Sequence, residues 1–189
     1  MKKYYGQFKE DKYLDLRCKL PKKGIFVDVG AGGIDGSNSY YFEKKGWVVL
    51  CIEPDKRHRG LKKRKLVDNS VVGSSEKEVD FVFHRLPKLS GLYHDKKSSV
   101  KLQMLKLDTI LEKHKIENID VLSIDVEGNE TDVLSGFDSD KYKPAYIIIE
   151  HTNQFKGNDQ IGMTEILANL GYAVIHKTLS NLIAKRKEA

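Results

Sequence analysis

The amino-acid sequence predicts an α/β fold in which helices cover both faces of a mostly parallel sheet. Residues 24–38 form a short apolar run, rich in β-branched residues, that breaks into glycines where a helix can begin. Further strand-like runs alternate with helix-like segments, which is the pattern of parallel sheets. The last two runs, residues 172–176 and 181–184, are joined by a short turn. They predict a hairpin with an antiparallel strand at the edge of the sheet.

The strands are predicted from apolar runs and from alternation of apolar and polar residues. In chain order they cover residues 24–30, 47–53, 66–72, 79–83, 100–107, 119–125, 145–150, 172–176 and 181–184. Pro54 stops the second strand, and residues 79–83 are expected near the edge of the sheet. Residues 84–100 contain proline, glycine and serine and predict a long loop, a kind of segment that often carries function.

The helices are predicted from caps and from apolar spacing. They lie within residues 12–20, 37–45, 56–65, 127–135 and 161–170, with one more that begins at Asp108. Ser37 or Asn38 is the expected cap of the second helix, and Gly46 its end. The helix at Asp108 is expected to open with a capping box formed by residues 109–112.

The composition fits one globular domain and excludes several classes of protein. The chain has 189 residues, of which 40% are hydrophobic and 32% charged, so it can bury a core and is not disordered. No apolar run approaches the ~20 residues of a membrane span, and the first residues lack the apolar segment of a signal peptide. Cys18 and Cys51 are expected to be buried thiols without metal or redox spacing, in a reducing compartment. A cytoplasmic location is therefore expected.

The formal charge of +6 is concentrated partly in residues 56–65. Two interpretations stay open for this basic segment: a solvated helix face, or a surface that meets phosphate or an acidic sugar. Aromatic residues are not interleaved with it, so a stacking surface for single-stranded nucleic acid is not indicated.

The glycine turn does not fit a dinucleotide. Nicotinamide and flavin sites use the pattern G-x-G-x-x-G, and the position that should hold the third glycine is Asp35. Asp28 and Asp35 would also repel a pyrophosphate. No Gly-Lys-Ser/Thr follows, so a phosphate loop of the Walker type is excluded as well.

S-adenosylmethionine suits these residues better, because it has no phosphate and carries a sulfonium and an ammonium group. Asp28 could reach the methionine end directly or through water; alternatively its carboxylate caps the turn. Glu53, at the end of the second strand, could accept two hydrogen bonds from ribose hydroxyls, a placement that nicotinamide enzymes share. The alternative for Glu53 is a surface residue before Pro54.

Several separate segments resemble the FkbM-type methyltransferases. The likeness runs from Tyr5 to about Lys185, nearly the whole chain. Its motifs are Gly6-Gln-Phe-Lys-Glu-Asp-Lys12, Phe26-Val-Asp-Val-Gly-Ala31, Ser37-Asn-Ser39, Trp47 with Cys51-Ile-Glu-Pro-Asp55, Leu89-Ser-Gly-Leu92, Leu107-Asp108 and Ile124-Asp-Val-Glu-Gly-Asn-Glu130. One departure is that Gly32-Gly33-Ile34 intervenes before Asp35-Gly36, where the family usually shows Gly-Ala-x-Asp-Gly.

The resemblance implies the Rossmann-like class I methyltransferase fold, in one domain over residues 1–189, with an N-terminal loop and helix over residues 1–23. The implied sheet is seven-stranded and mostly parallel, with an antiparallel C-terminal hairpin. The implied cofactor is S-adenosyl-L-methionine, and the implied reaction is O-methylation of a sugar, a glycan or another hydroxylated small molecule. The expected cofactor-binding residues are Asp28, Gly30, Ala31, Gly32, Gly36, Ser37, Asn38, Glu53, Ser70, Val71 and Asp125.

A hydroxyl acceptor benefits from a general base, and the candidates follow the two central strands. Asp125, Glu127 and Glu130 follow one strand, and Glu150 and His151 end the next. We expect Asp125, Glu127 and His151 to be catalytic, because crowded carboxylates raise one pKa towards a useful value. The alternatives are that Glu127 and Glu130 charge the start of the next helix and that His151 is an ordinary strand-end residue.

Asp125, Glu127 and His151 could also be an alternative set of ligands for a divalent cation, since hard cations take carboxylates. We nevertheless expect no resident metal. Nucleic acid is not an expected partner, because the Asn/Asp-Pro-Pro-aromatic and Pro-Cys motifs of base methyltransferases are absent. Two other functions stay open: a nucleic-acid methyltransferase, and a non-catalytic module that binds an anionic partner through its basic segment. The identity of the acceptor and the oligomeric state do not follow from the sequence.

Overall fold

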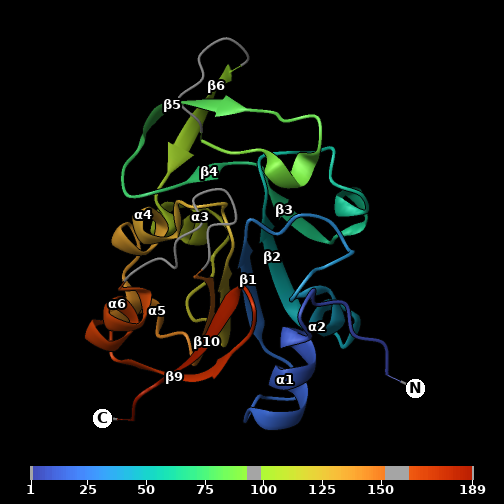
Figure 1. Cartoon of the computed structure of the whole chain (residues 1–189), viewed down its shortest axis with the longest axis vertical. Helices are drawn as coiled ribbons and strands as arrows, with labels where there is room; N and C mark the ends of the chain where they lie inside the picture. The colour runs from blue at the N-terminus through green and yellow to red at the C-terminus, as the bar shows by residue number, and fades with distance from the viewer. Residues whose placement is uncertain (1, 93–98, 152–161, 189) are drawn as a thin grey trace.

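A seven-stranded sheet forms the centre of the molecule (Figure 1). The structure is a computed structural model that describes residues 2–92, 99–151 and 162–188. Within them the strand order is β3-β2-β1-β7-β8-β10-β9. The strands are β1 (Ile25–Val29), β2 (Val48–Ile52), β3 (Leu66–Asp68), β7 (Val121–Ile124), β8 (Tyr146–Glu150), β9 (Tyr172–Lys177) and β10 (Asn181–Arg186).

The first five strands of that order are parallel, and β10 pairs antiparallel with both of its neighbours. The α/β class and the C-terminal hairpin are thus confirmed. The antiparallel strand is not at the edge, however, because β10 inserts between β8 and β9. The second strand of the hairpin therefore pairs with β8, and the first strand, β9, lies at the edge of the sheet.

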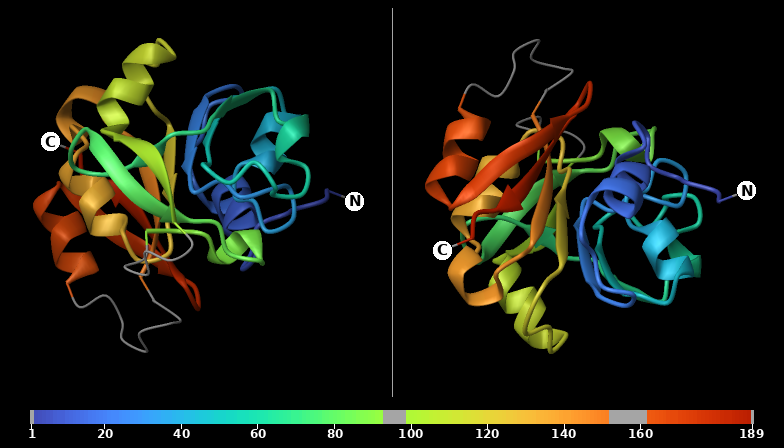
Figure 2. Two further views of the ribbon diagram at one scale, coloured as in Figure 1. Left: turned by 90° about the horizontal axis from the view of Figure 1, so that it is seen from above. Right: turned by 90° about the horizontal axis from the view of Figure 1, so that it is seen from below.

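The central strands are apolar on both sides because helices cover both faces of the sheet. Alternate residues of each strand enter different cores: Val27 and Val29 pack into one cluster, and Phe26 into the other. The helices α1 (Glu10–Arg17) and α2 (Tyr40–Lys44) supply residues to the second cluster. The remaining helices supply residues to the first cluster: α3 (Leu107–Lys113), α4 (Glu130–Ser135), α5 (Ser139–Tyr142) and α6 (Met163–Asn169). Figure 2 shows these two groups on opposite faces.

Two helices begin differently from the prediction, and hydrogen bonds of the predicted capping residues explain the difference. Helix α2 begins at Tyr40 with Ser39 at the N-cap, because the Ser37 hydroxyl accepts the amides of Ser39 and Tyr40 and closes a turn before the helix. Helix α3 begins at Leu107, and no side chain caps it. The predicted capping box is wrong, since the Thr109 hydroxyl donates to Glu76 instead.

The basic segment 56–65 is not a helix, contrary to prediction. Only a short 3₁₀ turn, η1 (Leu61–Lys63), forms there. Gly60 has a φ of +83°, which interrupts a right-handed helix just before it. Arg64 turns inward and its Nε lies 2.7 Å from the buried Glu43 carboxylate, so the charges of this segment do not share one face.

A second, three-stranded sheet differs from prediction. It consists of β4 (Val71–Val72), β6 (Ser99–Leu105) and β5 (Lys77–Val82), in the order β4-β6-β5. The single strand predicted over 66–72 is divided, because β3 joins the large sheet and β4 the small one. Residues 79–83 were expected at the edge of the main sheet, but β5 pairs antiparallel with β6. The small sheet stands at the top of Figure 1.

The loop predicted over residues 84–100 contains a 3₁₀ turn, η2 (Pro87–Leu89), and a bridge between Gly91 and Val82. Residues 93–98 of that loop lie outside the described residues. None of the described helices is long and apolar enough to cross a membrane.

Replacing Arg64 by leucine should lower the free energy of unfolding by about 3–5 kcal/mol, because the buried Glu43 carboxylate would lose its cation. Chemical denaturation measures the change. Lys62→Ala is the matched control in the same segment, and since Lys62 is exposed its effect should stay within about 0.5 kcal/mol. An Arg64→Leu protein as stable as the control would contradict a stabilising role for this ion pair.

Candidate functional site

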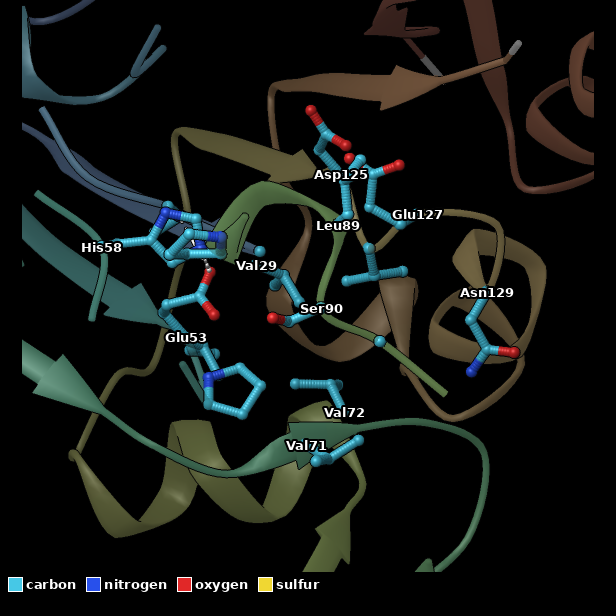
Figure 3. Close-up of a pocket in the computed structure, with 18 of the residues that line it drawn as sticks. Val29, Glu53, His58, Val71, Val72, Leu89, Ser90, Asp125, Glu127 and Asn129 are labelled. Atoms are coloured by element: carbon cyan, nitrogen blue, oxygen red, sulfur yellow. Dashed lines mark hydrogen bonds and ion pairs between the residues drawn. The ribbon is translucent and has the colours of Figure 1, made fainter. Parts of the chain in front are cut away.

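A cavity lies at the carboxyl ends of β1, β2 and β7, beneath the small sheet (Figure 3). This is the end of a parallel sheet where ligands bind in open α/β folds. The lining residues are Gln7, 29–33, 35, 36, 52–54, His58, 70–72, Phe81, Pro87, 89–92, 125–127 and Asn129. In Figure 3, Glu53 and His58 lie at one side of the cavity, and Asp125 and Glu127 at another.

The glycine turn brings three strand ends together. The Gly30 amide donates to the carbonyl of Ile52 at 2.9 Å, and the Asp125 amide donates to the carbonyl of Val29 at 3.0 Å. Gly30 has a φ of +73°, and a Cβ there would lie 1.7 Å from the Asp125 carbonyl oxygen. Only glycine fits this position, so the backbone itself forms this part of the wall.

Glu53 follows β2 and points its carboxylate at the cavity (Figure 3). Its two oxygens accept the amides of Gly32 at 3.0 Å and Asp55 at 2.8 Å. Burial raises the pKa of Glu53 to about 7. The His58 ring lies 3.7 Å away, and burial lowers the pKa of that ring, so the contact is not a full ion pair near neutral pH.

The residues 89–92 that close the cavity are held by a clamp centred on the buried Asp55 carboxylate. Arg57 donates two hydrogen bonds to Asp55, at 2.8 and 2.6 Å, and the Ser90 hydroxyl donates to the same carboxylate at 2.7 Å. Arg57 also donates to the carbonyl of His84. Burial alone would raise the pKa of Asp55, but the bonds from Arg57 and Ser90 lower it to about 2. The clamp is therefore charged at neutral pH.

Asp28 lies beneath the cavity and does not line it. Its carboxylate accepts the Ser39 hydroxyl, and Arg64 donates to the same hydroxyl at 2.6 Å. Burial raises the pKa of Asp28, although the Arg64 charge acts in the opposite direction. Ser37 and Asn38 are buried alongside; Ser37 accepts from Arg64, and Asn38 donates to Ser123. The structure brings these three residues together one layer below the cavity wall.

The turn after β7 presents two carboxylates to the cavity. Asp125 and Glu127 both line it, and Glu127 has a φ of +59°. The buried Glu130 side chain holds this turn by accepting the amides of Val126 and Gly128, each at 3.0 Å. Glu130 thus orders the turn rather than capping its helix. Burial, together with repulsion from Glu127 and Glu130, raises the pKa of Asp125 well above its ordinary value.

The end of β8 adds further polar groups below the same turn. Glu150 and His151 are both buried. Burial and repulsion from Asp125 raise the pKa of Glu150 to about 9. His151 does not line the cavity, and its backbone amide donates to the carbonyl of Ser180 at 2.8 Å.

Most of the predicted site residues meet at the cavity, although their roles stay predictions. The lining includes Gly30, Ala31, Gly32, Gly36, Glu53, Ser70, Val71, Asp125 and Glu127. Asp28, Ser37, Asn38 and His151 lie outside the lining. His58, Phe81 and Ser90 also line the cavity and were not predicted as site residues from the sequence. Of these three, only Ser90 lies in a motif shared with the family, at residues 89–92. His58 and Phe81 reach the cavity through turns and strand pairing, which the sequence does not reveal.

A family model described as "Methyltransferase FkbM domain" matches residues 28–174. The match spans β1 to β9 and includes every strand end that borders the cavity. Comparisons with curated proteins and with solved structures gave no match.

The raised pKa of Glu53 predicts a measurable dependence of stability on pH. The folded protein keeps this proton between pH 4.5 and about 7 while the unfolded chain loses it, so stability should fall as pH rises through that window. Relative to Glu53→Gln, the wild type should lose up to about 3 kcal/mol of unfolding free energy across it. Urea denaturation at several pH values measures the difference.

The matched control for this prediction is Glu78→Gln, which removes an exposed carboxylate from β5. Its stability difference from the wild type should not change over the same window. If the unfolding free energies of the wild type and Glu53→Gln changed with pH in parallel, the pKa of Glu53 in the folded protein would have to be near its ordinary value.

Proposed function

Because the chain belongs to the FkbM methyltransferase family, we propose that it transfers a methyl group from S-adenosylmethionine to a hydroxyl group of a sugar, a glycan or another hydroxylated small molecule. One observation supports the proposal most directly: a single cavity has the Glu53 carboxylate at one side and the Asp125 and Glu127 carboxylates at another (Figure 3). Glu53 follows the second strand, where a carboxylate can accept hydrogen bonds from ribose hydroxyls. We also propose a cytoplasmic setting, supported by the free thiols of Cys18 and Cys51.

The Glu53 side of the cavity fits a nucleoside. Two backbone amides fix the Glu53 carboxylate, and each oxygen keeps a lone pair for a ribose hydroxyl. Val71 and Val72, with Phe81 from the small sheet, supply apolar walls suited to an adenine ring. Gly30 leaves the backbone bare beside them, so a ligand can approach closely.

The Asp125 side of the cavity fits a cation better than a phosphate. Asp125 and Glu127 line it, and the buried Glu130 and Glu150 lie behind, so the local charge is negative or neutralised by protons. S-adenosylmethionine, when bound, supplies an electrophilic methyl group on a sulfonium. A positive ligand is attracted to this wall, whereas a pyrophosphate would be repelled. The same charge argues against a nucleic-acid backbone close to the reacting end.

The acceptor hydroxyl must lose its proton during transfer, and Asp125 or Glu127 can receive it. Burial and like charge raise the pKa of Asp125, which makes it a stronger base than an exposed carboxylate. Residues 89–92, held by the clamp of Asp55, Arg57 and Ser90, line the cavity and shape the space for the acceptor. Most of the rate advantage of such a site comes from holding the two reactants in line.

Calorimetric titration with S-adenosylmethionine and with its demethylated product tests the cofactor assignment. We expect 1:1 binding by the wild type and roughly 10- to 100-fold weaker binding by Glu53→Ala, since hydrogen bonds to a charged group contribute about 1.5–3 kcal/mol. Glu78→Gln, on the exposed face of β5, should bind as the wild type does. A wild type that bound neither compound at millimolar concentration would leave a non-catalytic module as the surviving interpretation.

Transfer of a radiolabelled methyl group to a panel of sugars and glycans, with RNA and DNA as competitors, tests the acceptor class. We expect label in a hydroxylated small molecule or glycan. We also expect Asp125→Asn or Glu127→Gln to lower kcat by about 10²–10⁴-fold, the usual contribution of a general base. The control is Glu112→Gln, whose exposed carboxylate pairs with Lys141 and does not line the cavity. Greater incorporation into RNA or DNA than into the panel would replace the proposal with a nucleic-acid methyltransferase.

A further inference from the structure

Three carboxylates from separate elements converge beneath the cavity. Asp125 follows β7, Glu130 is the first residue of α4, and Glu150 is the last residue of β8. One oxygen of each lies within 4.8 Å of the others. Among the described residues, this is the group of acidic, histidine and cysteine side chains with the spacing to hold a metal ion.

The Glu150 carboxylate is the second, independent sign of a ligand. Glu150 is only 5% exposed, and its Oε2 atom has no hydrogen-bond partner in the part of the chain that the structure describes. A buried carboxylate oxygen without a partner is costly, and native proteins rarely leave one. In the same described part, no lysine or arginine pairs with Asp125 or Glu150. Within the part of the chain that the structure describes, nothing therefore satisfies this oxygen, and a bound cation would do so.

We propose that Asp125, Glu130 and Glu150 bind a hard divalent cation such as Mg²⁺, Mn²⁺ or Ca²⁺. Such ions take carboxylate oxygens at about 2.0–2.6 Å, so two oxygens on opposite sides of the ion lie about 4–5 Å apart. The observed limit of 4.8 Å is compatible with that spacing. Three converging carboxylates also offer the hard oxygen ligands that these ions prefer over thiols and imidazoles.

The surroundings of Glu130 support the same assignment. Its Oε1 atom accepts the amides of Val126 and Gly128, which fixes the orientation of the carboxylate. Ligating carboxylates in proteins are commonly oriented by such outer hydrogen bonds. The set differs from the one considered from sequence, because Glu130 and Glu150 replace Glu127 and His151. The chain fold, and not sequence spacing, brings these two residues together.

The ion would lie directly below the cavity, since Asp125 belongs both to the cluster and to the lining. Binding of an ion by these residues does not rest on the proposed transferase activity. Where that activity is present, the ion would share the Asp125 carboxylate with the reacting end of the cavity and reduce its negative charge.

Titration of the full chain with Mn²⁺ tests the proposal without any cofactor. After removal of metals by chelation, electron paramagnetic resonance should show one Mn²⁺ bound per chain, and Mg²⁺ or Ca²⁺ should displace it. Glu150→Gln keeps the shape of the side chain and should weaken Mn²⁺ binding at least about tenfold. Loss of a residue that only hydrogen-bonds to a metal ligand lowers metal affinity about 10- to 100-fold, and loss of a direct ligand should lower it at least as much. Circular dichroism confirms that the variant is folded.

Glu127→Gln is the matched control, since it removes one negative charge from the same turn but none of the three carboxylates of the cluster. It should retain most of the Mn²⁺ affinity. The proposal is overturned if the wild type binds no Mn²⁺ at millimolar concentration, which would leave protons or water as the partners of Glu150. It is also overturned if Glu150→Gln binds as tightly as Glu127→Gln. A failure of S-adenosylmethionine to bind would leave these results unchanged, so the two proposals fail separately.

Discussion

The approach of the Gly30 backbone to the Asp125 carbonyl is the constraint on which the site depends. It is possible only because residue 30 lacks a Cβ, which would lie 1.7 Å from that oxygen. Hydrogen bonds from Gly30 to Ile52 and from Asp125 to Val29 extend the pairing of β2, β1 and β7 by one residue beyond the strands. The three strand ends therefore meet without a gap. As a result, Glu53 on one side and Asp125 on the other face the same cavity.

Buried charge is balanced differently on the two sides of this contact. Below the glycine turn, Arg64 pairs with Glu43 and reaches Asp28 through the Ser39 hydroxyl, so the acids there have a buried cation. Below the turn after β7, burial raises the pKa of both Asp125 and Glu150, repulsion from Asp125 adds to the rise at Glu150, and no described lysine or arginine pairs with either. The first arrangement is complete within the protein. The carboxylates below the turn after β7 have no such cation among the described residues, and this difference supports the proposed metal site.

Features set by local sequence could be predicted, and those set by long-range packing could not. The runs that became β1, β7 and β8 are mostly apolar, so their burial in a parallel sheet could be predicted. Residues 66–72 look like one strand, yet their division between two sheets depends on pairing with β6, more than 25 residues away. The basic segment 56–65 resembled a helix because periodicity does not reveal that Arg64 turns inward to Glu43. Glu53 and Asp125 were predictable as strand ends, whereas the approach of Glu150 to Glu130 needs the three-dimensional structure.

The end of β2 links the Glu53 side of the cavity to the covering loop at residues 89–92. One Glu53 oxygen accepts the amide of Asp55, and the Asp55 carboxylate in turn holds Arg57 and Ser90. Asp55 is buried whereas the Arg57 side chain is 47% exposed, so these charge-assisted bonds are partly shielded from water. Movement of residues 89–92 would leave that carboxylate with fewer donors, which is costly for a buried charge. Residues 89–92 are therefore held by Asp55, and the backbone amide of the same residue orients the Glu53 carboxylate.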